Sequence, residues 1–266
     1  MRWLPSSLLL VLAAGCHPRA GEPAADSTSG REDPPAAYAA TTPSPEPVVA
    51  AQGPASDEAD AEAQPIALQL PPYAAIIIHD VKDYDAWRSA FDANADARKA
   101  ASLIGESVMR GVDNDKTVAV YVPATELAKT KAFFADKELA RAMKASGVQG
   151  TPTVYLFKLV AAKMAMQPVG DVYSAIVKYH VANFDAFKRA IEAGDAARNA
   201  AGLIGWGVGQ GTHKPTEAYL YLQSNDPAKL KAYLGAKKTK SAMKRASARG
   251  QAETTVVREI SNRMYE

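Results

Sequence analysis

The chain has 266 residues, of which 47% are hydrophobic, and its formal net charge is +2. It contains one cysteine, Cys16, so no disulfide can form within a single chain. The rest of the protein therefore has no thiol for nucleophilic or metal chemistry.

The first sixteen residues, MRWLPSSLLLVLAAGC, have the pattern of a secretory signal. Arg2 gives a basic start, and the apolar run that follows is too short to span a bilayer. The segment resembles a bacterial lipoprotein signal, with residues 13–15 as the lipobox, although the commonest version has Leu at Ala13. The resemblance implies export and a membrane anchor through acylated Cys16. His17 in place of Asp implies the outer membrane. The alternative is a cytosolic protein that begins with an apolar segment by chance.

Residues 17–70 consist mainly of Ala, Pro, Ser, Thr, Gly and acidic residues. They show no apolar periodicity, so we expect a disordered tether between the signal peptide and the folded part. Because the tether is acidic, the net charge conceals a more basic folded part. Export makes nucleic acid an unsuitable partner in spite of this charge.

The rest of the chain contains an internal sequence repeat. The stretch ARKAASLIG at 97–105 returns as ARNAAGLIG at 197–205. A shift of one hundred residues aligns 84–150 with 184–250 without a gap, and about a third of the positions are identical. We therefore predict one folding unit in two copies, a first repeat at 71–165 and a second at 171–262.

The first repeat predicts strands and helices in the order βαββαβ, which is the ferredoxin-like unit. The expected elements are a strand at 74–81, a helix at about 83–101, strands at 105–111 and 116–122, a helix at about 126–146 and a strand at 151–160. The second repeat follows the same order from Tyr173 to about Ile260.

A single unit of this kind covers only one face of its sheet with helices, so the other face must be buried elsewhere. Two copies whose bare faces meet would enclose a shared interior with eight strands. The sequence therefore predicts an α+β fold in which two tandem ferredoxin-like repeats form one intramolecular barrel.

Several residues of the first repeat carry a resemblance to a known family. They are His79, DYDAW at 83–87, Phe91, Arg98 and AMKASGVQGTP at 142–152. With them the chain resembles the dimeric α+β barrel superfamily, which includes the antibiotic biosynthesis monooxygenases. The resemblance covers both repeats and implies oxygenation without a cofactor as one activity of the fold. Members often have a histidine where this chain has Asn94 and Gly194, and the second repeat replaces Trp87 by Phe187.

Strand alternation predicts which side chains face the shared interior. Val118, Val120 and Val122, with Ala218, Leu220 and Leu222, are expected under the helices, so Tyr121, Tyr219 and Tyr221 should point into the barrel. In the first strands, Ile76 and Ile78 with Val177 and Tyr179 are expected under the helices. His79, His180 and Lys178 would then face the interior or its rim.

The segment GWGVGQG at 205–211 does not match the GxGxxG phosphate-binding pattern, because its glycines recur at every second residue. It indicates a strand with one bare face. A hairpin centred on Lys214 would pair Gly209 with Tyr219 and Gly207 with Tyr221, and would set Ser107 opposite Tyr121. Either aromatic rings pack over the glycines, or a ligand slot lies beside Lys178, Tyr219 and Tyr221.

His79 and His180 are interpreted as equivalent histidines of the two repeats. They are either hydrogen-bonded structural residues or groups that contact a ligand or move a proton. Two neutral ligands without a carboxylate or thiolate make a poor metal site, so we expect no metal and no cofactor. Arg98 and Arg198 are expected to contact a helix end or a carboxylate.

The basic run at 229–250 is interpreted as the solvated face of an amphipathic helix, with Leu230, Leu234 and Met243 buried. The alternative is contact with an anionic lipid or polysaccharide.

Three functions remain open from the sequence. The first is an envelope lipoprotein whose barrel binds a small molecule without changing it. The second is a cofactor-independent monooxygenase for a small aromatic substrate, with His79, His180 and Tyr121 as candidate catalytic residues. The third is a structural or partner-binding barrel. The volume and polarity of the cavity should separate them.

Overall fold

The computed structural model describes residues 70–164 and 170–265. The first repeat comprises β1 (Tyr73–Val81), α1 (Tyr84–Ala93), α2 (Ala95–Ala100), β2 (Gly105–Gly111), β3 (Thr117–Ala124), α3 (Leu127–Phe134), α4 (Lys137–Ala145) and β4 (Val148–Lys163). The second comprises β5 (Tyr173–Val181), α5 (Phe184–Ala193), α6 (Asp195–Ala200), β6 (Leu203–Gly211), β7 (Glu217–Ser224), α7 (Pro227–Gly235), α8 (Lys237–Arg245) and β8 (Ala248–Met264). Cys16 and the predicted tether lie outside the described residues.

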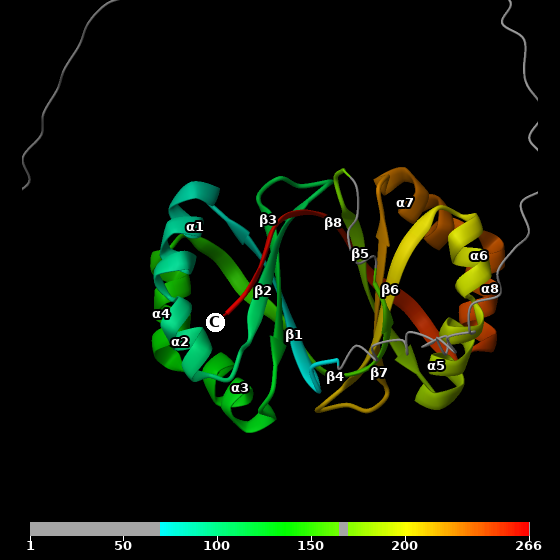
Figure 1. Ribbon diagram of the computed structural model, residues 1–266, viewed down its shortest axis with the longest axis horizontal. Helices are drawn as coiled ribbons and strands as arrows, with labels where there is room; N and C mark the ends of the chain where they lie inside the picture. Colours follow the sequence, from blue (N-terminus) through cyan, green and yellow to red (C-terminus); the bar gives the residue numbers. More distant parts are fainter. Residues whose placement is uncertain (1–69, 165–169, 266) are drawn as a thin grey trace, which may run out of the picture. The chain divides into compact units, whose positions relative to one another are not determined.

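The eight strands form one closed barrel in the order β1-β3-β2-β8-β5-β7-β6-β4. Every neighbouring pair is antiparallel. Helices α1 to α4 lie on one side of the barrel and α5 to α8 on the other (Figure 1). The predicted fold class, two ferredoxin-like repeats in one intramolecular α+β barrel, is confirmed.

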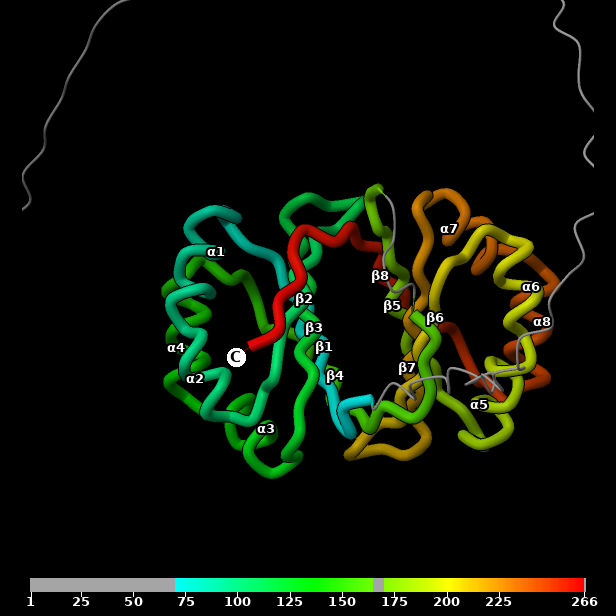
Figure 2. Tube along the Cα trace, viewed as in Figure 1, coloured from blue at the N-terminus to red at the C-terminus, as the bar shows by residue number. Residues whose placement is uncertain are grey.

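The last strand of each repeat closes the barrel by pairing with both repeats. β4 pairs with β1 of its own repeat, and its end at 157–163 pairs with β6 of the other. In the same way, β8 pairs with β5 and then, over 257–264, with β2. Figure 2 shows the red C-terminal strand crossing to the first half. The two repeats are therefore joined by continuous hydrogen-bonded ladders.

Each helix that the sequence predicts as continuous is divided in two. In the first repeat, α1 ends at Asn94, whose φ of −94° and ψ of 16° interrupt the helix before α2 begins. The second helix is interrupted at Asp136, whose carboxylate accepts from the Glu138 amide and so caps α4. Among the described residues, no helix has both the length and the apolarity that a membrane span requires.

The helix ends repeat at the same positions. Residues with positive φ follow α2 and α6 at Ser102 (64°) and Gly202 (76°), and follow α4 and α8 at Gly147 (92°) and Ser247 (70°). A left-handed residue after a helix ends it, and glycine adopts this conformation at the lowest cost. The match in backbone conformation supports the one-hundred-residue offset between the repeats.

Three hydrophobic clusters form the core. One lies between α1 to α4 and the sheet and includes Ile77, Trp87 and Val120. A second lies under α5 to α8 and includes Tyr179, Phe187 and Leu220. The third fills the barrel interior with Ala74, Ile76, Met109, Ala119, Tyr155, Phe157, Ile176, Tyr219 and Val257. The bare sheet faces of the two repeats therefore cover each other, as expected.

Large and small side chains alternate across the interior. Phe157 of the first repeat packs directly over Gly209 of the second, and the equivalent residues are the smaller Val257 of the second repeat and the larger Met109 of the first. Each of these two places thus combines one large residue with one small one. The predicted register is confirmed, since Gly209 pairs with Tyr219, Gly207 with Tyr221 and Ser107 with Tyr121. The ring over Gly209, however, belongs to Phe157 and not to a tyrosine.

A Gly209→Ala substitution is expected to lower the free energy of unfolding by about 1–3 kcal/mol. A Cβ at Gly209 would overlap the Phe157 ring, with two further ring carbons at 2.8 and 2.9 Å. Gly207→Ala is the matched control, because its Cβ would meet nothing closer than 3.7 Å. Urea denaturation of both variants tests the packing. Equal losses at the two glycines would show that Phe157 does not fill this space.

Candidate functional site

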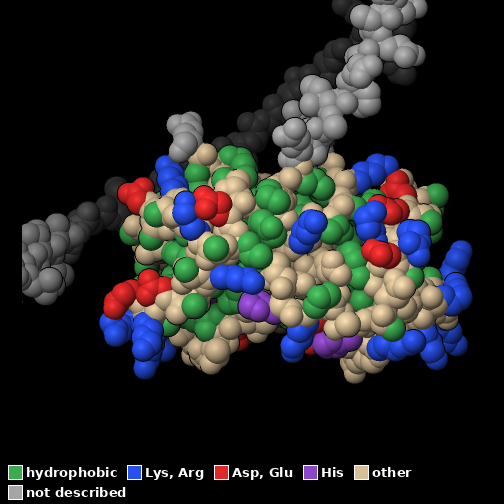
Figure 3. All heavy atoms as spheres, turned by 90° about the horizontal axis from the view of Figure 1, so that it is seen from below, with side chains coloured by type: hydrophobic (Ala, Val, Ile, Leu, Met, Phe, Trp, Pro, Cys, Tyr) green, Lys and Arg blue, Asp and Glu red, His purple; other side chains and the backbone are tan. Residues whose placement is uncertain are grey.

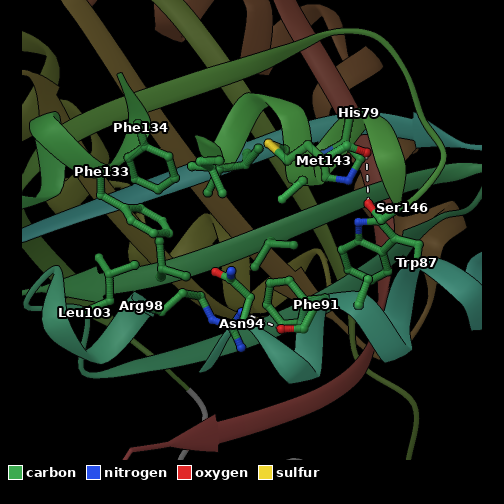
Figure 4. Close-up of a pocket in the computed structure, with 16 residues that line it drawn as sticks. His79, Trp87, Phe91, Asn94, Arg98, Leu103, Phe133, Phe134, Met143 and Ser146 are labelled. Carbon is green, nitrogen blue, oxygen red and sulfur yellow. Dashed lines mark hydrogen bonds between the residues drawn. The ribbon is translucent and has the colours of Figure 1, made fainter. Parts of the chain in front are cut away.

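A pocket lies between the helices and the sheet of the first repeat, and its volume is about 90 Å³. Its floor comes from β1 and β3 and its walls from α1 to α4. The lining residues are Ile77, His79, Trp87, Ala90, Phe91, Asn94, Arg98, Leu103, Val120, Val122, Phe133, Phe134, Leu139, Ala142, Met143 and Ser146. Figure 4 shows His79, Trp87 and Ser146 at one end, and Arg98, Phe133 and Phe134 at the other.

Aromatic rings dominate the walls. Trp87 stacks on Phe91 with ring centroids 5.0 Å apart, and the His79 ring lies 5.6 Å from Trp87. Phe133 and Phe134 meet edge to face at 5.3 Å. Trp87 is buried, whereas Phe91, Phe133 and Phe134 are only partly buried. Such walls favour a flat apolar guest.

His79 is the buried polar group of the pocket. The residue is 6% exposed, and neither of its ring nitrogens has a hydrogen-bond partner among the described residues. Burial lowers the pKa of His79 to about 4, partly offset by the nearby Asp80 carboxylate. The imidazole is therefore neutral at pH 7 and retains a free donor and a free acceptor. Since buried polar groups normally have partners, this pair of free nitrogens indicates a ligand contact.

Two further polar side chains line the pocket. Asn94 stands at the break between α1 and α2, and its carboxamide makes no hydrogen bond to another described residue. The Ser146 hydroxyl donates to the Met143 carbonyl at 2.9 Å and can still accept a hydrogen bond. These groups can orient a guest that carries a hydroxyl or carbonyl.

Arg98 forms the far wall within a buried network. Its guanidinium donates to Glu106 at 2.8 Å, to the Phe91 carbonyl at 2.6 Å and to the Tyr265 hydroxyl at 2.6 Å. It also lies 3.7 Å from the centre of the Phe91 ring. Arg263 donates to the other Glu106 oxygen at 2.8 Å. The expected contacts of Arg98, a carboxylate and a helix end, are both present, and they hold Phe91 in the pocket wall.

The predicted equivalence of His79 and His180 is wrong. The one-hundred-residue offset holds through the first strands, so His79 pairs with Val118 as Tyr179 pairs with Ala218. His180 corresponds instead to Asp80. It lies opposite Glu217 and is exposed, on a strand that is not adjacent to β1 in the barrel. The two histidines therefore do not form one site.

The predicted orientation of β1 is also wrong. Ile76 and Ile78 belong to the barrel interior, whereas Ile77 and His79 lie under the helices. The prediction shifted this strand by one residue against β5, and a shift of one residue moves every side chain to the opposite face. For β5 the prediction is correct, since Val177 and Tyr179 lie under the helices.

The three predicted interior tyrosines, Tyr121, Tyr219 and Tyr221, do face the barrel, and the hydroxyls of the last two have partners. Tyr219 donates to Glu217 at 2.8 Å and packs on Tyr155 and Phe157. Tyr221 is hydrogen-bonded to Ser174 at 2.6 Å.

The charged group beside these rings is paired as well. Lys178 pairs with Glu253 at 3.1 Å and with Glu217 at 3.6 Å. Burial raises the pKa of Tyr121 to about 12, so this phenol stays neutral at pH 7 and is a poor base. The unpartnered nitrogens of His79 lie in the first repeat's pocket instead.

The second repeat changes the lining at the equivalent place. Tyr179, Ile191 and Leu220 take the places of His79, Phe91 and Val120, and all three are buried. The Tyr179 ring packs on Phe187 with centroids 5.3 Å apart. Gly194 and Ala246 replace the polar Asn94 and Ser146 of the first repeat. The side-chain polar groups of Asn94 and Ser146 thus have no counterpart at these two positions of the second repeat.

The sequence interpretation missed most of this pocket, because it looked for the site inside the barrel. The signal was present in the comparison of the two copies. Four lining positions of the first repeat differ from their equivalents in polarity or burial, namely His79, Phe91, Asn94 and Ser146. Within the described residues, no group of three or more His, Cys, Asp or Glu side chains is placed to hold a metal ion.

Comparison with known proteins supports the fold. No protein-family model and no curated protein matches the chain. Among solved structures, a candidate monooxygenase from Fusobacterium nucleatum has a TM-score of 0.54 at 11% identity, covering 74% of this chain and 96% of its own. An anthrone oxidase-like protein has a TM-score of 0.54 at 13% identity, with coverages of 74% and 94%. A candidate monooxygenase from Lactobacillus acidophilus has a TM-score of 0.50 at 11% identity, with coverages of 73% and 96%. The chain therefore shares the α+β barrel fold of these three solved structures, with both halves of its barrel in one polypeptide.

Proposed function

We propose that the protein binds a small aromatic molecule with a hydroxyl or carbonyl group in the pocket of the first repeat. The observation that carries this proposal is the neutral, buried imidazole of His79, whose two nitrogens have no partner inside an aromatic-walled pocket. The second repeat strengthens it, because the same fold there has Tyr179 in the hydrophobic core at the position of His79.

The size of the pocket limits the guest. Its volume of about 90 Å³ is below the 150 Å³ or so of an engineered cavity that holds benzene. One aromatic ring is therefore the part that enters between Trp87 and Phe134, and any further ring would extend toward solvent. A hydroxyl on that ring can donate to a nitrogen of His79, and Asn94 can contact a carbonyl.

A His79→Tyr substitution is expected to weaken binding of 2-naphthol, because it installs the residue that occupies this place in the second repeat. Isothermal titration calorimetry of the full chain should show a loss of affinity of about tenfold or more, as for a buried polar contact. His180→Tyr, on the exposed end of β5, is the matched control and should leave the affinity unchanged. Equal affinity of wild type and His79→Tyr would contradict the proposed site.

A second function, monooxygenation without a cofactor, is favoured by the same imidazole. The neutral imidazole of His79 can accept a proton from an activated CH₂ or phenol at pH 7, and its low pKa makes it a weak base for this step. The carbanion then passes its electrons to dioxygen. A CH₂ group and O₂ give a carbonyl and water, so the substrate supplies all the electrons. Two of the structurally similar proteins are named as an oxidase-like protein and a candidate monooxygenase, which agrees with oxygenation as the class of reaction.

The two functions differ in oxygen consumption. Anthrone is a suitable probe because its activated CH₂ is oxidised by this stoichiometry. The oxygenase function predicts that one O₂ is consumed for each anthrone. This consumption should be lost in His79→Gln and kept in His180→Gln. Binding of aromatic rings without oxygen uptake would leave binding alone as the function.

We further propose that Cys16 is acylated and anchors the protein in the outer membrane of an exporting cell. The support is the order of the first sixteen residues, a basic start, an apolar run and small residues before the single cysteine. Incorporation of labelled palmitate into the wild-type chain, with none into Cys16→Ser, is the expected result. Equal labelling of both chains would overturn this proposal.

A further inference from the structure

The second repeat carries a segment of one charge sign. From Pro227 to Ala252 the chain has eight Lys or Arg residues and no Asp or Glu. The corresponding segment of the first repeat, 127–152, contains Asp136 and Glu138. Their equivalents are Ala236 and Lys238, so the second repeat has lost both acids. A difference of this kind between two copies of one fold is not required by the fold.

The structure places these cations on one exposed face. In α8, Thr239 and Met243 point into the core, while Lys237, Lys238, Lys240, Lys244 and Arg245 are exposed. Arg249 at the start of β8 is exposed beside them. We call these six residues the α8 basic face. None of the six forms an ion pair with another residue of the described part of the chain.

Figure 3 shows blue side chains gathered along the lower right edge of the molecule, the end that carries the helices of the second repeat. Unpaired cations that crowd one face repel each other, and a counter-charge on a partner relieves this repulsion.

An apolar groove opens within this face. It lies between α8 and the first residues of β8 and has a volume of about 640 Å³. Tyr179, Leu234 and Met243 contribute apolar side chains to it, while Lys240, Lys244 and Arg249 contribute cations. The groove therefore combines an apolar lining with cations at its rim.

We propose that the α8 basic face and its groove bind the surface of an acidic phospholipid bilayer, with one anionic lipid held in the groove. The charge of the face is complementary to a lipid phosphate, and the apolar lining suits the acyl end of the same molecule. A soluble polyanion would use the charges but leave the apolar groove empty, which favours the lipid. This site is separate from the pocket of the first repeat and does not depend on it.

Vesicle co-sedimentation tests the proposal with the full chain carrying Cys16→Ser, so that no acyl anchor contributes. We expect binding to vesicles with about 30% phosphatidylglycerol in phosphatidylcholine, and weak binding to phosphatidylcholine alone. Binding should weaken as NaCl is raised, because salt screens exposed charges. Equal binding to both kinds of vesicle would overturn the proposal. Binding to dextran sulfate without binding to either kind of vesicle would also overturn it.

The first repeat supplies the test variant. Ala236→Asp, Lys238→Glu and Lys240→Ala together install the residues of α4 and remove four units of positive charge. The partition coefficient should fall about tenfold or more. Lys137→Glu with Lys144→Glu, on exposed positions of α4, removes the same charge and should change it less than about twofold. Thermal unfolding of both variants checks that each is folded. Equal losses in the two variants would show that net charge, and not this face, drives binding.

A short-chain lipid tests the groove itself. Dioctanoyl phosphatidylglycerol should shift the methyl NMR signals of Met243 and Leu234, whereas glycerol 3-phosphate, which has no acyl chains, should not. If both compounds shift these signals, or neither does, the lipid is not held in the groove.

Discussion

Replacing Glu106 with alanine is expected to lower the free energy of unfolding by about 3–5 kcal/mol, as for removal of one partner of a buried ion pair. The Glu106 side chain is 1% exposed and accepts hydrogen bonds from Arg98, Arg263 and the Tyr265 hydroxyl. Without it, the buried Arg98 guanidinium would keep its charge and lose its carboxylate. Urea denaturation monitored by circular dichroism measures the loss.

The effect should extend across the barrel, because Glu106 joins the two repeats. It lies on β2, while Arg263 and Tyr265 belong to the end of the chain, which lies beside β2 and α2 in Figure 1. Glu138→Ala is the control. Glu138 pairs with Arg141 on the surface of α4, where both side chains are at least 70% exposed, so its loss should cost less than about 1 kcal/mol. A loss for Glu106→Ala as small as for Glu138→Ala would contradict the buried network.

Acidification is expected to destabilise the wild type by about 3 kcal/mol more than His79→Tyr. The pKa of His79 is about 4 in the folded protein and 6.5 in the unfolded chain. Between these values only the unfolded chain takes up the proton, so the stabilising contribution is complete above pH 6.5. It is lost as the pH falls toward 4. The cause is burial, since a charged imidazole in this pocket would have no water around it.

The measurement is the free energy of unfolding of wild type and variant from pH 7 to pH 4. Other carboxylates titrate in both proteins, so the difference between the two curves isolates His79. His79→Gln provides a second non-titrating variant should the tyrosine be too large for the pocket. Parallel curves for wild type and both His79 variants would mean that His79 titrates as in water.

Much of the fold follows from the sequence because the chain contains two copies of one unit, which can be compared with each other. The repeat fixes the order of elements, and the uncovered sheet of each unit requires the other. The strand bounds at 105–111 agree with β2, and the glycine and tyrosine register of the β6–β7 hairpin is correct. The helix breaks at Asn94 and Asp136 were not predicted, because both segments keep an apolar periodicity across the break.

The site was harder to predict, for a reason that lies in one strand. The run AAIIIHDV of β1 is apolar on both faces, so alternation gives no orientation there, and His79 was placed on the wrong side. The offset from the downstream alignment, applied to β1, would have matched His79 with Tyr179. The pocket itself arises where Trp87, Phe133 and Phe134 leave space, and the volume left between packed side chains cannot be read from composition.

A duplicated barrel allows its halves to diverge. The first repeat keeps the pocket with His79, while the second has Tyr179 at that position and gains the α8 basic face. Two separate identical chains could not divide these features, since every substitution would appear on both sides. One chain therefore provides one pocket and one basic face.

The most direct test locates an aromatic probe inside the protein. Intermolecular nuclear Overhauser effects between 2-naphthol and the full chain report which rings the probe contacts. The account predicts contacts with Trp87, Phe91 and Phe134 of the first repeat, with one probe bound per chain. Contacts with Tyr121, Tyr219 and Tyr221 in the barrel interior, or with Tyr179 and Phe187 of the second repeat, would contradict it.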